Sequence, residues 1–118
     1  MTDPYGPEVR RLFGAPAHAG RLDPARVGAA GDAEASVQLF AQVADGRIVA
    51  MRFLARGCPH LIAAAEATCV ALEGRNAVEF NEFDASAIRD RLAVPVEKTG
   101  RILLIEDAVR LLGQQSGG

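Results

Sequence analysis

The chain is poor in residues that carry metal, redox or aromatic chemistry. Its 118 residues include two cysteines, two histidines, one tyrosine and no tryptophan. Because aromatic residues make up only 5% of the chain, a base-stacking surface for nucleic acid is not expected. The net charge of −2 provides no broad basic surface either. We therefore expect no nucleic-acid partner.

Long apolar segments are missing as well. No stretch approaches the roughly 20 apolar residues that cross a bilayer, and residues 1–11 contain no apolar core of a signal peptide. We therefore expect no membrane partner and a cytoplasmic location. In that compartment the two cysteines are expected to be free thiols rather than a disulfide.

The short motifs of common enzymes are also absent. The chain has no Ser-His-Asp order, no dinucleotide fingerprint and no Cys-x-x-Cys, and Gly-Ala-Ala-Gly at 28–31 is too generic for a phosphate loop. We therefore predict that the protein is not an enzyme. A length of 118 residues is sufficient for one core, so residues 1–118 are expected to form a single domain.

Two period-two patterns predict a β-hairpin at about 36–55. Core-facing side chains are expected at alternate positions of each run: Val37, Leu39, Ala41 and Val43, then Val49, Met51, Phe53 and Ala55. The runs flank Asp45-Gly46, which favours a type I′ turn. Phe40 and Leu54 fall on the outer face, so part of that face is expected to be covered. A weak third strand is predicted near 26–29, inside a long loop that spans 14–32.

Helices are predicted on both sides of the hairpin. A short helix is expected at 6–13, and an Ala-rich helix at 59–73 with one apolar face, Pro59 as its first residue and Gly74 just past its end. Asp84 or Ser86 begins a short helix that ends near Leu92, and Thr99 caps the last helix. Residues 1–5 and 113–118 are expected to be disordered tails. The fold class is α+β, with helices on one face of a small antiparallel sheet.

The strongest chemical signal is Cys58, which follows Gly57 at the change from strand to helix. As N-cap, its thiol lies near backbone N–H groups that favour the thiolate by about 0.3–1 kcal/mol. His60 is expected at the surface, or as a metal ligand that reaches in from the rim. Cys69 lies about 16 Å further along the helix axis and is expected to be a buried, inert thiol.

Other candidates depend on the hairpin for their position. Asp32 and Glu34 precede its first strand, so they flank the same end as Cys58 at the exit of the second strand. They are ordinary loop acids or, with Cys58 and His60, ligands of a metal ion. Lys98 is expected to be a surface lysine, and nothing near His18 marks that residue.

The order of these pieces resembles the U-type iron–sulfur cluster assembly scaffolds, the IscU and NifU N-terminal domain family. The resemblance covers residues 5–112 and rests on several segments together: Val37–Val43, Asp45–Ile48, Arg52-Phe53, Gly57-Cys58, Ile62-Ala63, Gly74, Leu92–Lys98, Leu103 and Glu106–Ala108. It implies an IscU-like fold, a bound iron–sulfur cluster or zinc at one end of the molecule, and a cysteine desulfurase or another assembly protein as partner. A homo-oligomer is a further implication.

The family's ligand pattern is incomplete in this chain. By resemblance, ligands come from a Cys-Gly-Asp before a strand, a Gly-Cys at a helix start and a His-Cys before the last helix. Here Gly57-Cys58 remains, Ala33 stands at the first cysteine, and Gly100 and Arg101 replace the His-Cys, while Lys98 is retained. A cluster takes four ligands, mostly thiolates, so cluster or zinc binding is expected to be weak or absent. Arg101 repels a metal cation but stabilises a thiolate or an anion.

Three functions are therefore open. The first is a divergent scaffold-like assembly protein that accepts sulfur, or binds metal weakly, through Cys58. The second is a regulatory paralogue that docks a cysteine desulfurase or another assembly partner without chemistry. The third is a thiol or anion-binding protein that uses Cys58, Lys98 and Arg101. These three residues are also the candidates for binding a cofactor.

Overall fold

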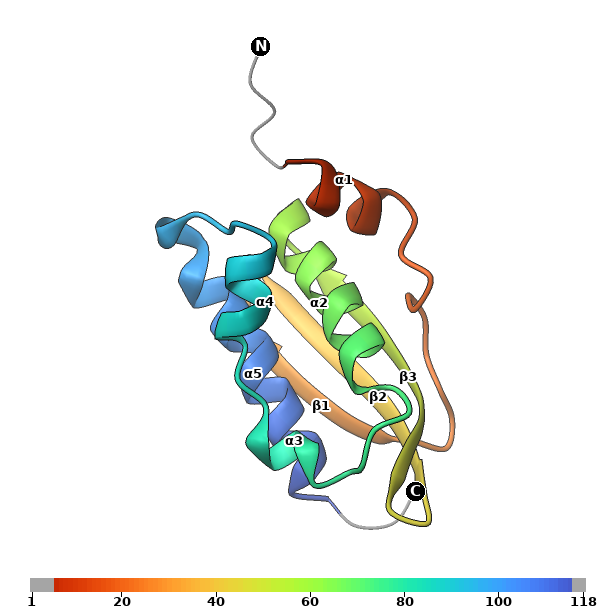
Figure 1. Ribbon diagram of the computed structural model, residues 1–118. Coiled ribbons are helices and arrows are strands. Elements are labelled where there is room, and N and C mark those ends of the chain that lie inside the picture. The colour runs from red at the N-terminus through yellow and green to blue at the C-terminus, as the bar shows by residue number, and fades with distance from the viewer. Residues whose placement is uncertain (1–5, 116–118) are drawn as a thin grey trace.

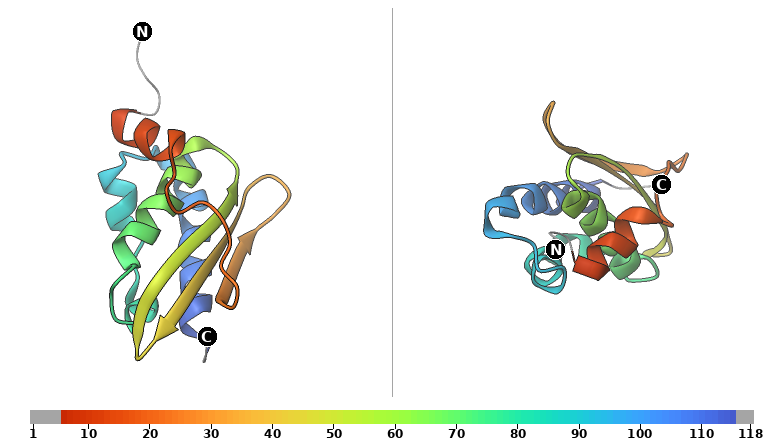
Figure 2. Two further views of the ribbon diagram at one scale, coloured as in Figure 1. Left: turned by 90° about the vertical axis from the view of Figure 1, so that its right-hand side faces the viewer. Right: turned by 90° about the horizontal axis from the view of Figure 1, so that it is seen from above.

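The structure is a computed structural model that describes residues 6–115, apart from the side chain of Glu97. A three-stranded antiparallel sheet in the order β1-β2-β3 carries helices on one face (Figures 1 and 2). The elements in chain order are α1 (Gly6–Gly14), β1 (Arg26–Gly31), β2 (Ser36–Ala44), β3 (Arg47–Arg56), α2 (Pro59–Leu72), α3 (Glu79–Glu82), α4 (Ser86–Arg91), the 3₁₀ helix η1 (Val96–Lys98) and α5 (Thr99–Gly113). The predicted α+β class, hairpin and third strand are confirmed.

The β2–β3 hairpin turns as its sequence predicts. Asp45 and Gly46 both have positive φ, 53° and 77°, as a type I′ turn requires. Leu39 pairs with Phe53, and both side chains are buried against the helices. The outer face is also partly covered, because the Arg21 guanidinium lies 5.8 Å from the centroid of the Phe40 ring.

A β-bulge corrects the predicted alternation at the start of β3. The register shifts between Gln42 and Val43, so Val43 pairs with Ile48 while Gln42 pairs with Ala50. Ile48 is therefore fully buried and Val49 is 54% exposed, the reverse of the predicted orientation. An extra residue in one strand reverses which face each side chain takes, and strict period-two reasoning cannot detect it.

Helix α5 lies close against β1. A Cβ atom on Gly28 would be 2.1 Å from the Ala108 carbonyl oxygen, so only glycine permits this approach. Beyond α5, the Gln115 side-chain amide accepts the Val27 N–H at 3.1 Å and donates to the Val27 carbonyl at 2.6 Å. The predicted disorder of the tail is therefore wrong for 113–115; residues 1–5 and 116–118 lie outside the described part of the chain.

Helix α2 is buried nearly all round, not on one face as predicted. The sheet, α1, α4 and α5 all contact it, and the buried set includes three polar residues, His60, Glu66 and Thr68. The Thr68 hydroxyl donates to the Ala64 carbonyl at 2.8 Å, which satisfies it within the helix. Cys58 is the N-cap, with φ −77° and ψ 161°, and Gly74 follows the helix with φ +90°, as predicted.

The C-terminal third differs from the prediction in detail. The N-cap of α4 is Ala85, so neither Asp84 nor Ser86 caps this helix as predicted, although Asp84 Oδ1 accepts the Ser86 N–H at 2.9 Å just before it. Helix α3 and the 3₁₀ turn η1 were not expected. Because η1 leads directly into α5, Lys98 is the N-cap and Thr99 the first helical residue, so the predicted cap is wrong by one position.

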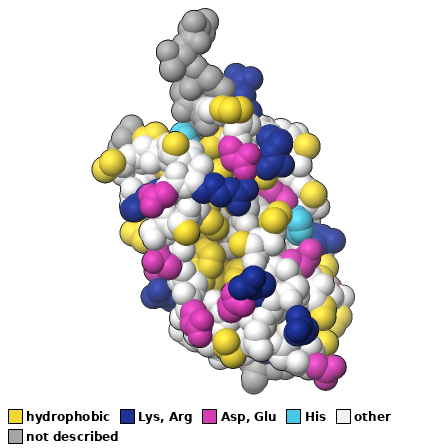
Figure 3. Space-filling view, in the orientation of Figure 1, with side chains coloured by type: hydrophobic (Ala, Val, Ile, Leu, Met, Phe, Trp, Pro, Cys, Tyr) yellow, Lys and Arg dark blue, Asp and Glu magenta, His cyan; other side chains and the backbone are white. Residues whose placement is uncertain are grey.

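The helix-bearing face is apolar along its middle. Figure 3 shows hydrophobic side chains there, with charged side chains above and below. Within residues 6–115, no helix has both the length and the apolar character needed to span a bilayer.

Candidate functional site

Three segments meet at one end of the molecule, and the hairpin register predicts the meeting of two of them, the β1–β2 loop and the Cys58 corner. Gly57 lies against the β1–β2 loop, because a Cβ built on it would be 3.3 Å from the Ala35 Cβ atom. Across the same loop, a shallow cavity of about 220 Å³ reaches the start of α5. The cavity is lined by Asp32, Glu34, Ala35, Gly100, Arg101 and Leu104. The family's three ligand positions are thus neighbours in this fold.

Asp32 anchors the β1–β2 loop. Its Oδ1 atom accepts the backbone N–H groups of Glu34 at 2.9 Å and Ala35 at 3.2 Å. These two hydrogen bonds, with smaller contributions from the Arg101 and Arg56 charges, lower the pKa of Asp32. The Arg56 guanidinium also donates to the Asp32 carbonyl oxygen at 3.5 Å. The carboxylate is therefore already committed to loop N–H groups and faces two cations.

Cys58 occupies the corner between β3 and α2. Its side chain is half-buried against the core and makes no capping hydrogen bond. Its carbonyl oxygen accepts the N–H groups of Leu61 at 3.0 Å and Ile62 at 3.3 Å, which begins the helix. The backbone of Cys58 therefore builds the helix start, while the thiol remains available for chemistry.

His60 is not the surface residue that the sequence predicted. It is 4% exposed, because α1 packs across the first turns of α2. Within the described part of the chain, no three His, Cys, Asp or Glu side chains lie close enough to hold a metal ion. The roles of Cys58, Asp32, Glu34 and His60 as metal ligands remain a prediction.

The remaining candidates differ in their exposure. Cys69 is fully buried as predicted, and burial raises the pKa of its thiol. Lys98 is half-buried at the end of η1, and Arg101 is half-buried on the wall of the cavity. Arg101 therefore lines the candidate site, whereas Lys98 precedes it in the 3₁₀ helix η1 and does not line the cavity.

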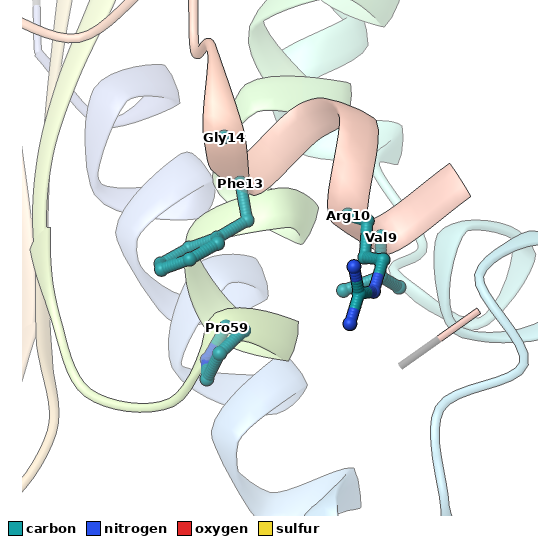
Figure 4. A pocket seen from close by; sticks show the side chains of 5 residues that line it. All are labelled: Val9, Arg10, Phe13, Gly14 and Pro59. Carbon is teal, nitrogen blue, oxygen red and sulfur yellow. The ribbon is translucent and has the colours of Figure 1, made fainter. Parts of the chain in front are cut away.

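An apolar cavity beside Pro59 was not foreseen. It has a volume of about 380 Å³ and is lined by Val9, Arg10, Phe13, Gly14 and Pro59, so α1 faces the first residue of α2 (Figure 4). The Phe13 ring points toward Pro59 and is 44% exposed. The helical spacing of Val9 and Phe13 predicted a packed face but gave no sign that one side would stay open.

His18 was also missed. Its ring lies between Glu66 of α2 and Glu73, the C-cap of that helix: Nδ1 is 2.6 Å from Glu66 Oε2 and Nε2 is 3.2 Å from Glu73 Oε1. These partners are 48 and 55 positions away in the sequence. No local pattern marks such a group, because only the tertiary fold brings the residues together.

Solved structures share this fold. A putative iron–sulfur cluster assembly scaffold protein for the SUF system from Fervidobacterium islandicum AW-1 superposes with a TM-score of 0.76 and 15% identity, over 92% of this chain and 96% of that one. The N-terminal part of a nitrogen-fixing NifU-like protein from Brucella abortus gives 0.67 and 12%, over 94% and 95%. At such low identity the likeness shows the fold alone. No curated protein sequence matches the chain.

The family itself is shown at the level of sequence. The model of the NifU-like N-terminal domain matches residues 4–111, which is most of the 118-residue chain and includes Cys58, the β1–β2 loop and the start of α5. The chain therefore belongs to the NifU-like N-terminal domain family.

Proposed function

We propose that this protein acts in iron–sulfur cluster assembly as a scaffold-like sulfur acceptor, with Cys58 as the accepting thiol. The observation that carries the proposal is the position of Cys58. It is half-buried at the start of α2 and makes no capping bond, at the end of the molecule where the β1–β2 loop and the start of α5 meet. Family membership supports the assembly role, and the single thiol at this end favours sulfur acceptance over holding a cluster.

The proposed step moves one sulfur atom without net redox change. The Cys58 thiolate attacks the outer sulfur of a cysteine persulfide on a desulfurase. A new S–S bond forms on Cys58, the donor's S–S bond breaks, and the donor cysteine leaves as a thiolate. Because a thiolate is the nucleophile, the positive charge of Arg101 at this end supports the step.

The donor set does not fit a cluster held by one chain. A cluster takes four ligands, mostly thiolates, and this end offers one thiol with Asp32 and Glu34 nearby. Asp32 is engaged by two loop N–H groups. Weak metal binding through Cys58, Asp32, Glu34 and His60, or bridging by Cys58 from two copies, is the lesser form of the proposal.

The alternative is a regulatory paralogue that docks an assembly partner without chemistry. The cavity beside Pro59 favours a docking surface, because an exposed aromatic ring lies next to an apolar hollow. Both functions use this end of the molecule. They differ in whether Cys58 reacts.

A sulfur-transfer assay separates the two. The protein is incubated with a purified cysteine desulfurase and ³⁵S-cysteine, then resolved without reductant. We expect label on the wild type and on Cys69→Ser, and its loss from Cys58→Ser. Label retained on Cys58→Ser would overturn the sulfur-acceptor proposal, and desulfurase binding without transfer to the wild type would favour the docking paralogue.

Metal analysis tests the proposal that one chain does not hold a complete cluster. After anaerobic reconstitution with iron and sulfide, we expect less than one cluster per chain. A stable [2Fe–2S] chromophore at one per monomer would contradict the proposal that Cys58 accepts sulfur rather than holding a cluster.

A further inference from the structure

A partly buried group of three titratable side chains fastens the segment between α1 and β1. His18 Nδ1 lies 2.6 Å from Glu66 Oε2, and His18 Nε2 lies 3.2 Å from Glu73 Oε1. The His18 backbone N–H also donates to Glu66 Oε1 at 2.8 Å. Glu66 is only 3% exposed, so its carboxylate depends on these partners rather than on water.

The geometry favours a doubly protonated ring. A neutral imidazole has one N–H, whereas both ring nitrogens of His18 face carboxylate oxygens. Glu66 also accepts a hydrogen bond from the His18 backbone N–H, so one carboxylate binds both the ring and the backbone of His18. Loss of the ring proton would leave one nitrogen lone pair directed at a carboxylate.

The same segment covers the free edge of β3. The Phe53 N–H donates to the His18 carbonyl at 2.9 Å, and the Gly20 N–H donates to the Phe53 carbonyl at 2.8 Å. Residues 18–20 thus act as a short parallel strand beside β3. An uncovered strand edge presents backbone groups that pair with other chains, so this cover protects the sheet.

We propose that His18, Glu66 and Glu73 form a pH-sensitive clasp that holds residues 18–20 on the edge of β3 and opens when the His18 ring loses its proton. The clasp joins three parts of the fold: the α1–β1 segment, helix α2 and strand β3. It is separate from Cys58, which lies at the other end of α2.

The charged groups around His18 favour the protonated form of its ring. Glu66 faces the ring from α2 and Glu73 from the C-cap of that helix. Glu73 Oε2 also accepts the Met51 N–H at 2.8 Å and lies 3.4 Å from the Arg52 guanidinium. Burial alone would lower the pKa of His18, but the hydrogen bonds and charges of the two glutamates outweigh it and raise the pKa. Cys69, the other titratable group in this region, stays a neutral thiol because burial raises its pKa.

The raised pKa of His18 determines how the stability of the clasp changes with pH. The clasp is fully formed below the ordinary histidine pKa of about 6.5, and its contribution is lost as the pH rises through the raised pKa. Above that pH the segment opens more often. Each unit by which the folded pKa exceeds the open value corresponds to about a tenfold loss of protection for amides that the clasp holds.

NMR of the whole protein tests the proposal. Nitrogen-15 shifts report whether both His18 ring nitrogens carry protons, and hydrogen exchange reports the opening of Gly20 and Phe53, corrected for the intrinsic pH dependence of exchange. We expect a doubly protonated ring at pH 6, a pKa above 6.5, and a loss of protection equal to the tenfold-per-unit relation. A singly protonated ring at pH 6, or constant protection of both amides through the His18 titration, would overturn it.

Two variants provide the comparison. Glu73→Gln should lower the His18 pKa and weaken protection of Gly20 and Phe53 at pH 6. Glu79→Gln, which removes a half-exposed carboxylate paired with Arg75 at 2.9 Å, should leave both unchanged. If Glu73→Gln does not fold, the wild-type titration decides the question alone. An unchanged His18 pKa in folded Glu73→Gln would contradict the clasp.

Discussion

The two ends of helix α2 differ in how their chemically reactive residues are held. Its start holds Cys58, half-buried and without a capping bond, beside a cavity and a loop. Its second half holds Glu66, Cys69 and Glu73, which are tied to distant segments or sealed in the core. The thiol at the start of α2 is therefore accessible, whereas the thiol in the second half is sealed in the core.

Thiol labelling should show the largest difference between the halves. We expect Cys58 to react with a maleimide at least about a thousandfold faster than Cys69, since Cys69 reacts only from opened molecules and folded domains are stable by about 5 kcal/mol or more. Mass spectrometry of Cys58→Ser and Cys69→Ser gives each rate separately. Similar labelling rates under native conditions would show that the two thiols do not differ in accessibility. In denaturant both thiols should react at the same rate, which serves as the control.

Truncation of Glu66 should cost the most stability. Glu66→Ala removes the acceptor of two hydrogen bonds from His18 and leaves a buried space, so we expect a loss of about 3 kcal/mol in the free energy of unfolding. The matched control is Glu79→Ala, which removes the partner of the exposed Arg75 side chain, with a loss of about 0.5 kcal/mol or less. Urea denaturation at pH 6 measures both. Equal losses would show that the second half of α2 is not held by this group.

The pH dependence of stability should be smaller and should belong to His18. Because its pKa is raised in the folded protein, the free energy of unfolding should fall as the pH rises from about 6.5 through the folded pKa. His18→Gln should flatten this part of the curve, while Cys58→Ser should not. Stability that rises over the same range in the wild type would be the opposite of the expected sign.

Substitution of Cys58 should change stability least. Serine is a preferred N-cap and Cys58 makes no side-chain cap bond, so Cys58→Ser should alter the free energy of unfolding by less than about 1 kcal/mol. Cys69→Ser places a hydroxyl in the core and should cost about 1–3 kcal/mol. Thermal and urea unfolding of both variants make the comparison. A larger loss for Cys58→Ser would mean that Cys58 is a structural residue.

The features that were predicted correctly depend on neighbours in the sequence. The turn at Asp45-Gly46 needs two residues that tolerate positive φ, and Pro59 can only begin a helix, which makes Cys58 the N-cap. The meeting of the β1–β2 loop with Cys58 follows from the hairpin register, since both flank one end of it. Local rules were sufficient to place the candidate thiol.

The errors share a different origin. The exchange of Ile48 and Val49 comes from a bulge set by packing across the sheet, and the burial of His60 comes from α1, which folds back across α2. The His18 clasp joins residues 48 and 55 positions apart. None of these features produces a periodic pattern in the sequence, because each depends on which surfaces meet after folding.

Turn chemistry, capping and ordered motifs act over short distances, so the amino-acid order was sufficient to specify the α+β class, the hairpin, the start of α2 and the family. Tertiary structure alone decided which groups share a low-dielectric interior. It buried Glu66 beside His18, sealed Cys69, and left Cys58 half-exposed at the corner. Burial sets the energy of every polar and titratable group, and it is a property of the packed molecule rather than of any segment.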